Sequence, residues 1–198
     1  MSGLEYEPAE TQIEEEIAKT TKTLAEYGIS TENWGKDSAK TVRHLAIEIL
    51  KGESRLESDP DTGKLIRHVA FVHVDVRYIT EDRTELQLVE DEQIFHDRPT
   101  PKIRNQIGVS EKLTSSQTPL DAARFGLRSE LGIQSDLNYS EPKTETFDDV
   151  SPTYPGLLNR KTKHAVQVYI GKDDYKPKYQ EVQWDKTTNF SWREVKAI

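Results

Sequence analysis

The amino-acid sequence predicts an α+β fold, in which strands carry most of the regular structure and helices are few. Residues 64–78, KLIRHVAFVHVDVRY, alternate between two faces and are rich in branched side chains, as a strand is. Residues 118–134, TPLDAARFGLRSELGIQ, carry the start and stop signals of one helix. Residues 8–27 place apolar residues at spacings of four and seven, as a helix does. Strands with a central helix and a helical N-terminal section are typical of this class.

Two helices are expected before the first long strand. The first covers residues 8–27 and carries glutamates near its start, where the helix dipole favours negative charge. The second runs from about residue 38 to residue 51, and Gly52 ends it. We therefore divide the chain into an N-terminal helical tail at residues 1–33, partly flexible, and a domain at residues 34–198 that includes the second helix as an N-terminal accessory helix.

The remaining extended segments are expected to form a sheet with the strand at residues 64–78. Only a short turn separates that strand from the next one, so the two should pair as an antiparallel hairpin. Two polar, loop-like stretches separate the later segments, one of them reaching about residue 186. The expected partners are residues 85–95, 101–113, 163–171 and 189–195.

Composition limits the classes of function. The 198 residues include 34% hydrophobic and 31% charged residues, with a net charge of -8, which disfavours nucleic acid polymers and anionic membranes as partners. The chain has no cysteine, which excludes disulfides, thiolate zinc sites and cysteine nucleophiles. No stretch approaches the about 20 apolar residues of a membrane span, and the acidic N-terminus lacks a signal-peptide pattern. We expect a soluble, intracellular protein located in the cytoplasm.

The helix at residues 118–131 is stabilised by its own sequence. Thr118 is a natural N-cap, Pro119 suits the first helical position, and Asp121 follows three residues after the cap. Gly132 then ends the helix. One face is apolar and should be buried: Leu120, Ala123, Leu127 and Leu131. These features explain why a helix forms here, but they do not indicate a function.

The same segment resembles the helical half of the Nudix box, whose family consensus is G-x5-E-x7-R-E-U-x-E-E-x-G-U with U apolar. The likeness lies in the pattern A-A-x-x-x-L-x-x-E-L-G-I, preceded by a loop and a hairpin. Four positions agree with the consensus: Leu127, Glu130, Gly132 and Ile133. Five depart from it: Glu111 stands for the first glycine, Gln117 for the loop acid, Phe125 for the arginine, and Gly126 and Ser129 for two glutamates.

The resemblance extends over roughly residues 34–198. YPGLL at residues 154–158, the strand KHAVQVYIG and the closing NFSW are similar to segments of some Nudix relatives. The resemblance implies a Nudix-like mixed-sheet α/β/α sandwich with a helical N-terminal extension. It also implies a hydrolase that cleaves a nucleoside diphosphate linked to another group, using magnesium held by the box glutamates.

This box is degenerate, because its metal-binding positions have lost their acids. Magnesium takes carboxylate and water oxygens, and the family supplies carboxylates at helix positions i, i+3 and i+4. Here these positions are Gly126, Ser129 and Glu130, so one acid remains. We expect no metal ligands and no cofactor, and magnesium only where acids arrive from elsewhere. Candidate acids, which surface solvation explains equally, are Glu90, Asp91, Glu92, Glu111, Asp148 and Asp149.

Basic residues cluster around the box in an otherwise acidic chain. Arginine forks and lysine charges can hold a phosphate-bearing ligand without metal. A tyrosine could stack a base, and a histidine could assist, although such side chains are also common in cores and at surfaces. The basic residues could equally form surface ion pairs. The predicted ligand-binding residues are Arg104, Lys112, Arg124, Arg128, Tyr154 and His164.

Three functions follow from these observations. The first is a pseudoenzyme that binds a nucleotide or another diphosphate-bearing ligand without hydrolysis, or an interaction module. The alternative is an enzyme with a rebuilt active site, a diphosphate hydrolase or other chemistry, in which Glu111 and Glu130 are the catalytic acid and base or hold a metal. The third is a structural protein that presents apolar helices to a protein partner. The sequence leaves the oligomeric state open.

Overall fold

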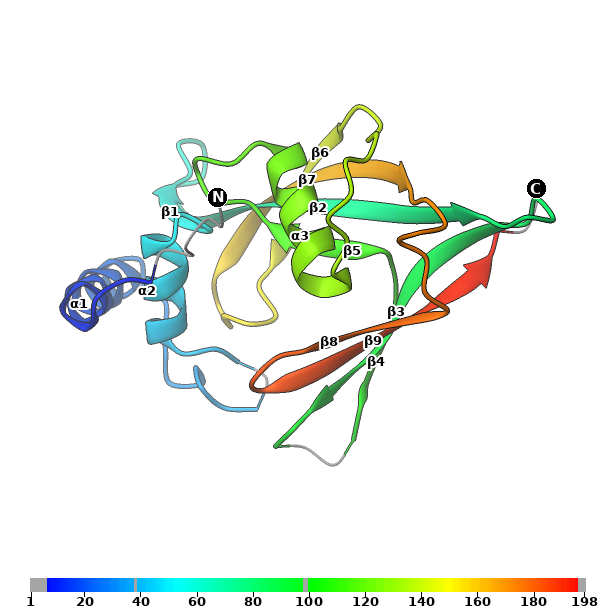
Figure 1. Ribbon diagram of the computed structural model, residues 1–198. Coiled ribbons are helices and arrows are strands. Elements are labelled where there is room, and N and C mark those ends of the chain that lie inside the picture. The colour runs from blue at the N-terminus through cyan, green and yellow to red at the C-terminus, as the bar shows by residue number, and fades with distance from the viewer. Residues whose placement is uncertain (1–6, 38, 98–99, 196–198) are drawn as a thin grey trace. The chain divides into compact units, whose positions relative to one another are not determined.

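Figure 1 shows a computed structural model that describes residues 7–37, 39–97 and 100–195. Within these residues the chain forms three helices and nine strands. In chain order they are α1 (Glu10–Glu26), α2 (Val42–Leu50), β1 (Arg55–Ser58), β2 (Leu65–Ile79), β3 (Glu85–Phe95), β4 (Lys102–Ile107), β5 (Val109–Lys112), α3 (Pro119–Leu131), β6 (Lys143–Val150), β7 (Leu158–Tyr169), β8 (Lys178–Val182) and β9 (Lys186–Glu194). The predicted α+β class, with many strands and few helices, is confirmed.

The chain divides into two compact units, which are described separately. Unit 1 consists of residues 1–70, 112–117 and 145–162, and unit 2 of residues 71–111, 118–144 and 163–198. Strands β2 and β7 each begin in unit 1 and end in unit 2. This division differs from the boundary at residues 33 and 34 expected from the sequence, and that boundary stays a prediction.

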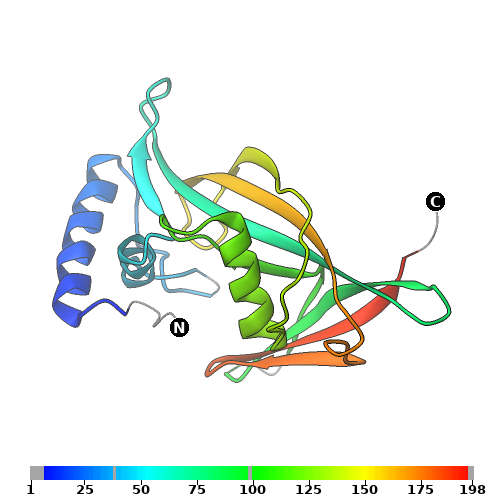
Figure 2. The same ribbon diagram turned by 45° about the horizontal axis from the view of Figure 1, so that its top comes forward.

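Unit 1 contains both N-terminal helices. Figure 2 shows α1 beside α2, and α1 contributes Leu24 to the core of this unit. The strand order in this unit is β6, β7, β2, β1, and β1 pairs antiparallel with the start of β2. Six buried side chains form the core, because each removes an apolar surface from water: Leu24, Trp34, Leu45, Leu65, Tyr154 and Leu157.

Unit 2 contains α3 and most of the strands. The strand order in this unit is β7, β2, β3, β9, β8, with β4 beside β3 and β5 beside β2. The end of β2 pairs antiparallel with the start of β3, which confirms the predicted hairpin. The rest of β3 lies between β4 and β9, and both of these pairings are antiparallel. Helix α3 packs against this sheet, where it contacts β8.

The elements differ from the sequence predictions in several places: strand β1 was not predicted, and β7 begins at Leu158 and not at residue 163. Helix α2 begins at Val42, because Thr41 and not an earlier residue forms the N-cap and its hydroxyl accepts from the backbone N–H of His44. Residues 143–150 and 178–182, predicted as loops, form strands β6 and β8. Both are polar strands, so their sequences lack the apolar alternation that a half-buried strand shows.

None of the helices in the described part of the chain combines the length and the apolar character needed to cross a membrane.

Candidate functional site

Helix α3 is held at both ends as its sequence predicts. The Thr118 side chain accepts from the backbone N–H of Asp121, and the Asp121 carboxylate accepts from the Thr118 backbone N–H in return. At the other end Gly132 has a φ of 71°, which is the left-handed conformation that ends many helices. The helix is therefore a rigid support for the side chains along it.

Gly126, in the middle of α3, allows strand β5 to approach the helix closely. A β-carbon built at this position would lie 3.2 Å from the Cβ of Glu111 and 3.3 Å from a methyl group of Val109. Val109 is fully buried and both neighbours belong to a strand, so neither can move away easily. A glutamate at position 126, as in the Nudix consensus, would require these atoms to shift by a few tenths of an ångström. The Cβ of Glu111 is the nearest of them.

Glu130 lies one turn after Gly126 and is surrounded by other carboxyl groups of unit 2. Burial is the largest cause that raises the pKa of Glu130, and the charges of Glu181, Glu111 and Glu90 raise it further. Lys186 opposes this, but the pKa still reaches about 9. Glu130 therefore holds its proton at neutral pH. We name the four glutamates the carboxyl cluster: Glu130 on α3, Glu181 on β8, Glu111 on β5 and Glu90 on β3.

Glu90 enters the carboxyl cluster because of a β-bulge in β3. Glu90 pairs with Phe190 and Glu92 pairs with Asn189, which leaves Asp91 as an extra residue. Glu90 is buried and accepts a 3.1 Å hydrogen bond from Nε of Arg104. Glu92 instead accepts from the Asn189 side-chain amide. The bulge thus separates three consecutive acids, and only Glu90 acts on Glu130.

The residues at the magnesium-binding positions of the Nudix consensus do not fit the ion. Gly126 offers no ligand, and the Ser129 hydroxyl donates to the backbone carbonyl oxygens of Phe125 and Gly126. Glu130 is protonated at neutral pH, and a neutral carboxyl group is a poor ligand for a hard divalent cation. Across the described ranges, no group of three or more His, Asp or Glu side chains is arranged to hold a metal ion.

The four predicted basic ligand-binding residues are not brought together. Arg104 is engaged with Glu90 and with Gln106, and Lys112 belongs to unit 1. Arg124 and Arg128 remain on the exposed face of α3. Arg124 lies 3.6 Å from Asp121 and over the ring of Tyr139, and Arg128 lies over the ring of Phe125.

Tyr154 and His164 are not members of the carboxyl cluster: Tyr154 belongs to unit 1, and His164 lies on β7 in unit 2. Tyr154 is fully buried in the core of unit 1, with its ring centroid 5.0 Å from that of Trp34, so it has no surface on which to stack a base. Its hydroxyl group has no hydrogen-bond partner in the described residues. His164 lies on β7, where its Nδ1 is 2.8 Å from the Thr144 hydroxyl, and burial lowers its pKa. No ligand role of either residue is tested by these contacts.

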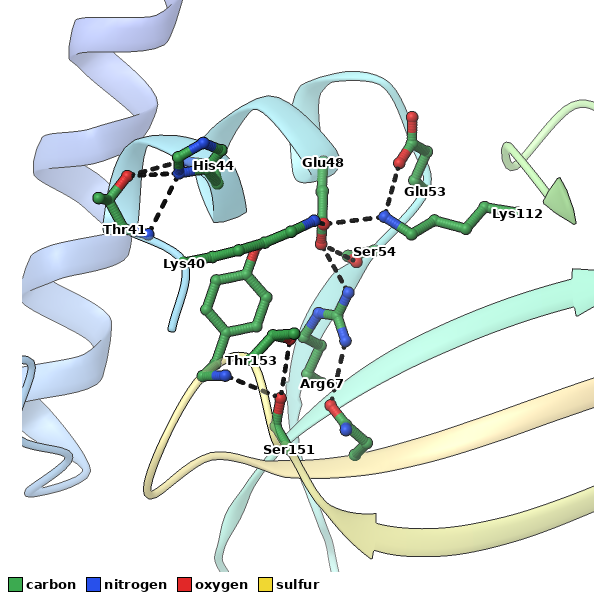
Figure 3. A network of polar contacts seen from close by, with 12 residues as sticks. Lys40, Thr41, His44, Glu48, Glu53, Ser54, Arg67, Lys112, Ser151 and Thr153 are labelled. Carbon is green, nitrogen blue, oxygen red and sulfur yellow. Dashed lines mark hydrogen bonds and ion pairs between the residues drawn. The ribbon is translucent and has the colours of Figure 1, made fainter. Parts of the chain in front are cut away.

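A second buried glutamate, Glu48 in unit 1, is surrounded by cations and not by acids. Lys40 and Lys112 each lie 2.8 Å from one Glu48 carboxylate oxygen, and Arg67 lies 2.6 Å from the other. Figure 3 shows these side chains around Glu48. Ser54 also donates to this carboxylate. Burial alone would raise the pKa of Glu48, but the three cations together hold it well below its usual value. We name Glu48, Lys40, Ser54, Arg67 and Lys112 the Glu48 network.

The sequence did not indicate several members of these two groups. Glu181 and Lys186 lie in or beside a stretch predicted as a loop, so no strand alternation placed them on a face. Glu48 lies in α2 on the side of buried Leu45, where an apolar residue would be expected. Of the six candidate acids from elsewhere in the chain, Glu90 and Glu111 do lie beside Glu130. Asp148 and Asp149 instead pair with Arg160 and Lys161 in unit 1.

Comparison with known proteins finds only solved structures of low similarity. No family model matches the chain, and no curated protein matches it. Among solved structures, it is similar to the C. elegans Ap4A hydrolase, with 11% identity, a TM-score of 0.38, and coverage of 63% of this chain and 79% of that chain. The NUDIX domain of Shewanella oneidensis NrtR, complexed with ADP ribose, has 8% identity, a TM-score of 0.41, and coverage of 69% and 77%. A Nudix hydrolase from M. smegmatis, RenU, has 11% identity, a TM-score of 0.35, and coverage of 63% and 70%. These values are too low to assign the chain to a family or to transfer an activity.

Proposed function

We propose that this protein is a Nudix-like binding module that holds a nucleotide or another diphosphate-bearing ligand without magnesium-dependent hydrolysis. The single observation that carries the proposal is the packing at Gly126. Strand β5 packs so closely against α3 that a side chain at position 126 requires its neighbours to shift, so the position is crowded as well as substituted. The residue-level resemblance of the box supplies the class of ligand, and the loss of its acids removes the hydrolysis.

The phosphate groups of the ligand would bind to Arg124 and Arg128. These residues stand four positions apart on α3, so their guanidinium groups lie on the same side of the helix. Both side chains are exposed, and the only ion pair of Arg124 among the described residues is a long one with an exposed aspartate. An exposed pair of this kind is worth little, so a phosphate can replace it. Arg104 and Lys112 are already bound to buried acids and are not part of this proposal.

A thermal-shift measurement with a panel of nucleotides and nucleoside diphosphate conjugates tests this function. A ligand that binds only the folded protein raises its melting temperature, by an amount that grows with ligand concentration. We expect a rise that is the same with and without Mg²⁺ and that is lost in the double variant Arg124→Gln/Arg128→Gln. Arg55→Gln, at an exposed position of unit 1, is the matched control and should keep the shift. Magnesium-dependent cleavage of any compound in the panel contradicts the proposal.

A second candidate function is metal-independent acid–base catalysis in the carboxyl cluster. It is favoured by the pKa of Glu130, which reaches about 9 and leaves this residue protonated beside Glu111. A protonated carboxyl group beside a second carboxyl group is an arrangement that acid–base catalysis uses. The test is the pH dependence of turnover. A rate that falls as pH rises through about 9, and that disappears in Glu130→Gln, would support this function over simple binding.

A further inference from the structure

The hydroxyl group of Thr188 is buried without a hydrogen-bond partner at the carboxyl cluster. Thr188 on β9 is 2% exposed, and its Oγ1 has no partner among the described residues. Its Cα lies directly opposite that of Glu181 on β8, so both side chains lie on the same face of the sheet. Lys186, two residues earlier on β9, shares this face. An unpaired buried hydroxyl is costly, and a hydrogen-bond donor placed beside it would remove that cost.

The charges around Thr188 favour a positively charged occupant. Four carboxyl groups meet here, those of Glu90, Glu111, Glu130 and Glu181. Lys186 acts on Glu130, and Arg104 is bound to Glu90. At Glu130 the charges of Glu181, Glu111 and Glu90 outweigh that of Lys186, so this residue keeps its proton. A bound cation would replace that proton.

We propose that the carboxyl cluster and the Thr188 hydroxyl form a binding site for an organic cation, the guanidinium or ammonium group of a ligand. This site goes beyond the proposed function, because it requires neither a diphosphate nor α3 arginines. The N–H groups of such a cation donate to Glu181 and Glu130 and to the Thr188 oxygen, which is otherwise without a donor. The Gln183 side chain already donates to one Glu181 oxygen at 2.7 Å and holds that carboxylate in place.

An organic cation suits this arrangement better than a phosphate or a small metal ion. A phosphate group would be repelled by the excess of carboxylates. A magnesium ion needs several oxygens converging at about 2.1 Å in octahedral geometry. A guanidinium group instead spreads its N–H donors over a plane, donates hydrogen bonds of about 2.8 Å to its partners, and sheds water more easily. Glu111, Glu130 and Glu181 are half-buried, so a ligand can reach them from solvent.

Titration of the full chain with methylguanidinium, followed by NMR chemical shifts, tests the site. The neutral isostere N-methylurea is the matched ligand control. We expect saturable shifts for methylguanidinium at Thr188 and Glu181, and an affinity at least tenfold weaker for N-methylurea. Glu181→Gln should weaken methylguanidinium at least tenfold and Thr188→Val at least threefold. Glu92→Gln, an acid on the other face of the sheet, should leave the affinity unchanged.

The pH dependence separates binding at Glu130 from general attraction to an acidic surface. The guanidinium group stays charged throughout, so any change comes from the protein. Because the cation replaces one proton, its affinity should rise by up to tenfold per pH unit and level off above about pH 9. In Glu130→Gln this rise should disappear while Glu181→Gln keeps it.

Three results would overturn the proposal: equal affinity for N-methylurea, equal affinity in Glu181→Gln, or tight Mn²⁺ binding that broadens the Thr188 signal and displaces methylguanidinium. Arg124→Gln/Arg128→Gln, which removes the proposed phosphate site, should not change methylguanidinium binding. The failure of nucleotide binding and the failure of cation binding are therefore separate outcomes.

Discussion

The two units each bury a glutamate on or beside a helix, and the two glutamates titrate in opposite directions. Glu48 in unit 1 meets Lys40, Arg67 and Lys112, and its pKa lies well below the usual value. Glu130 in unit 2 meets three carboxyl groups, and its pKa rises to about 9. Burial raises the pKa in both cases, so the sign of the neighbouring charges decides the outcome. A buried acid among cations holds a fold together, whereas a buried acid among acids is left for a ligand or a proton.

The largest expected effect comes from removing the charge of Glu48. Glu48→Gln leaves Arg67 buried and its charge uncompensated, which should lower the free energy of unfolding by about 3–5 kcal/mol at pH 7. Because the folded-state pKa is below the ordinary value of 4.5, this stabilisation exists above that pH and is lost as pH falls below it. Urea unfolding of the wild type and of Glu48→Gln at pH 7 and pH 3.5 measures the loss of unfolding free energy and its dependence on pH. The exposed Glu57→Gln should change stability by less than about 0.5 kcal/mol. Equal effects of the two variants at pH 7 would show that the Glu48 network is not stabilising.

Restoring the missing acid at position 126 should destabilise the protein and should not restore magnesium binding. The new side chain in Gly126→Glu meets Glu111 and Val109, and such overpacking costs about 1–3 kcal/mol. Ser129→Glu restores the neighbouring acid at an exposed position and is the matched control, with a cost below about 0.5 kcal/mol. Urea unfolding and titration with Mg²⁺ are the measurements. Tight magnesium binding by the double variant Gly126→Glu/Ser129→Glu would mean that the helix can still form a metal site.

Neutralising Glu130 should stabilise the protein, in contrast to neutralising Glu48. At pH 7 the unfolded chain ionises this residue while the folded protein keeps it protonated, so the wild type loses stability between pH 4.5 and about 9. Glu130→Gln removes that loss and should be more stable by about 1–2 kcal/mol at pH 7, a value reduced for the partial exposure of the group. Unfolding free energies at pH 5, 7 and 9 should diverge from those of the wild type as pH rises. Parallel pH profiles would mean that Glu130 is ionised in the folded protein.

The smallest effect should come from Thr188→Val. This substitution keeps the shape of the side chain and removes a buried hydroxyl that has no partner. We expect a gain of up to about 1 kcal/mol in unfolding free energy, because the cost of burying the hydroxyl disappears. Thermal unfolding in the absence of added cations measures it. A loss of stability would indicate that an ordered water already satisfies the hydroxyl group.

Local sequence patterns predict the elements whose structure depends on local physics. Helix α3 begins and ends as its cap residues indicate, and β3 covers the predicted residues 85–95. The same patterns fail for β6 and β8, whose polar sequences match no period because solvent lies along most of their length. Their strand character comes from pairing with β7 and β9, the next strands along the chain, and the polar residues of β6 and β8 do not by themselves indicate these pairings.

The candidate site was predictable only in part, for the same reason. Gly126 could be recognised from the sequence as a departure from the consensus, but the strand that approaches it could not. Glu111 and Glu130 were expected to act together, and both contribute to the carboxyl cluster. Glu181 and Thr188 escaped notice, because their roles depend on the register between β8 and β9. Lys112 was grouped with the arginines by sequence position, whereas its ammonium group binds Glu48 and Glu53.

The extra residue at Asp91 makes the side-chain directions in β3 depend on the number of residues in the strand, which substitutions do not change. It shifts the alternation of the strand by one, so that Glu90 reaches Arg104 while Glu92 reaches Asn189 on the far side. Deleting one residue here would restore a regular ladder and reverse the direction of every later side chain in the strand. Length at this point, and not only chemical identity, therefore determines which surface of the sheet is acidic.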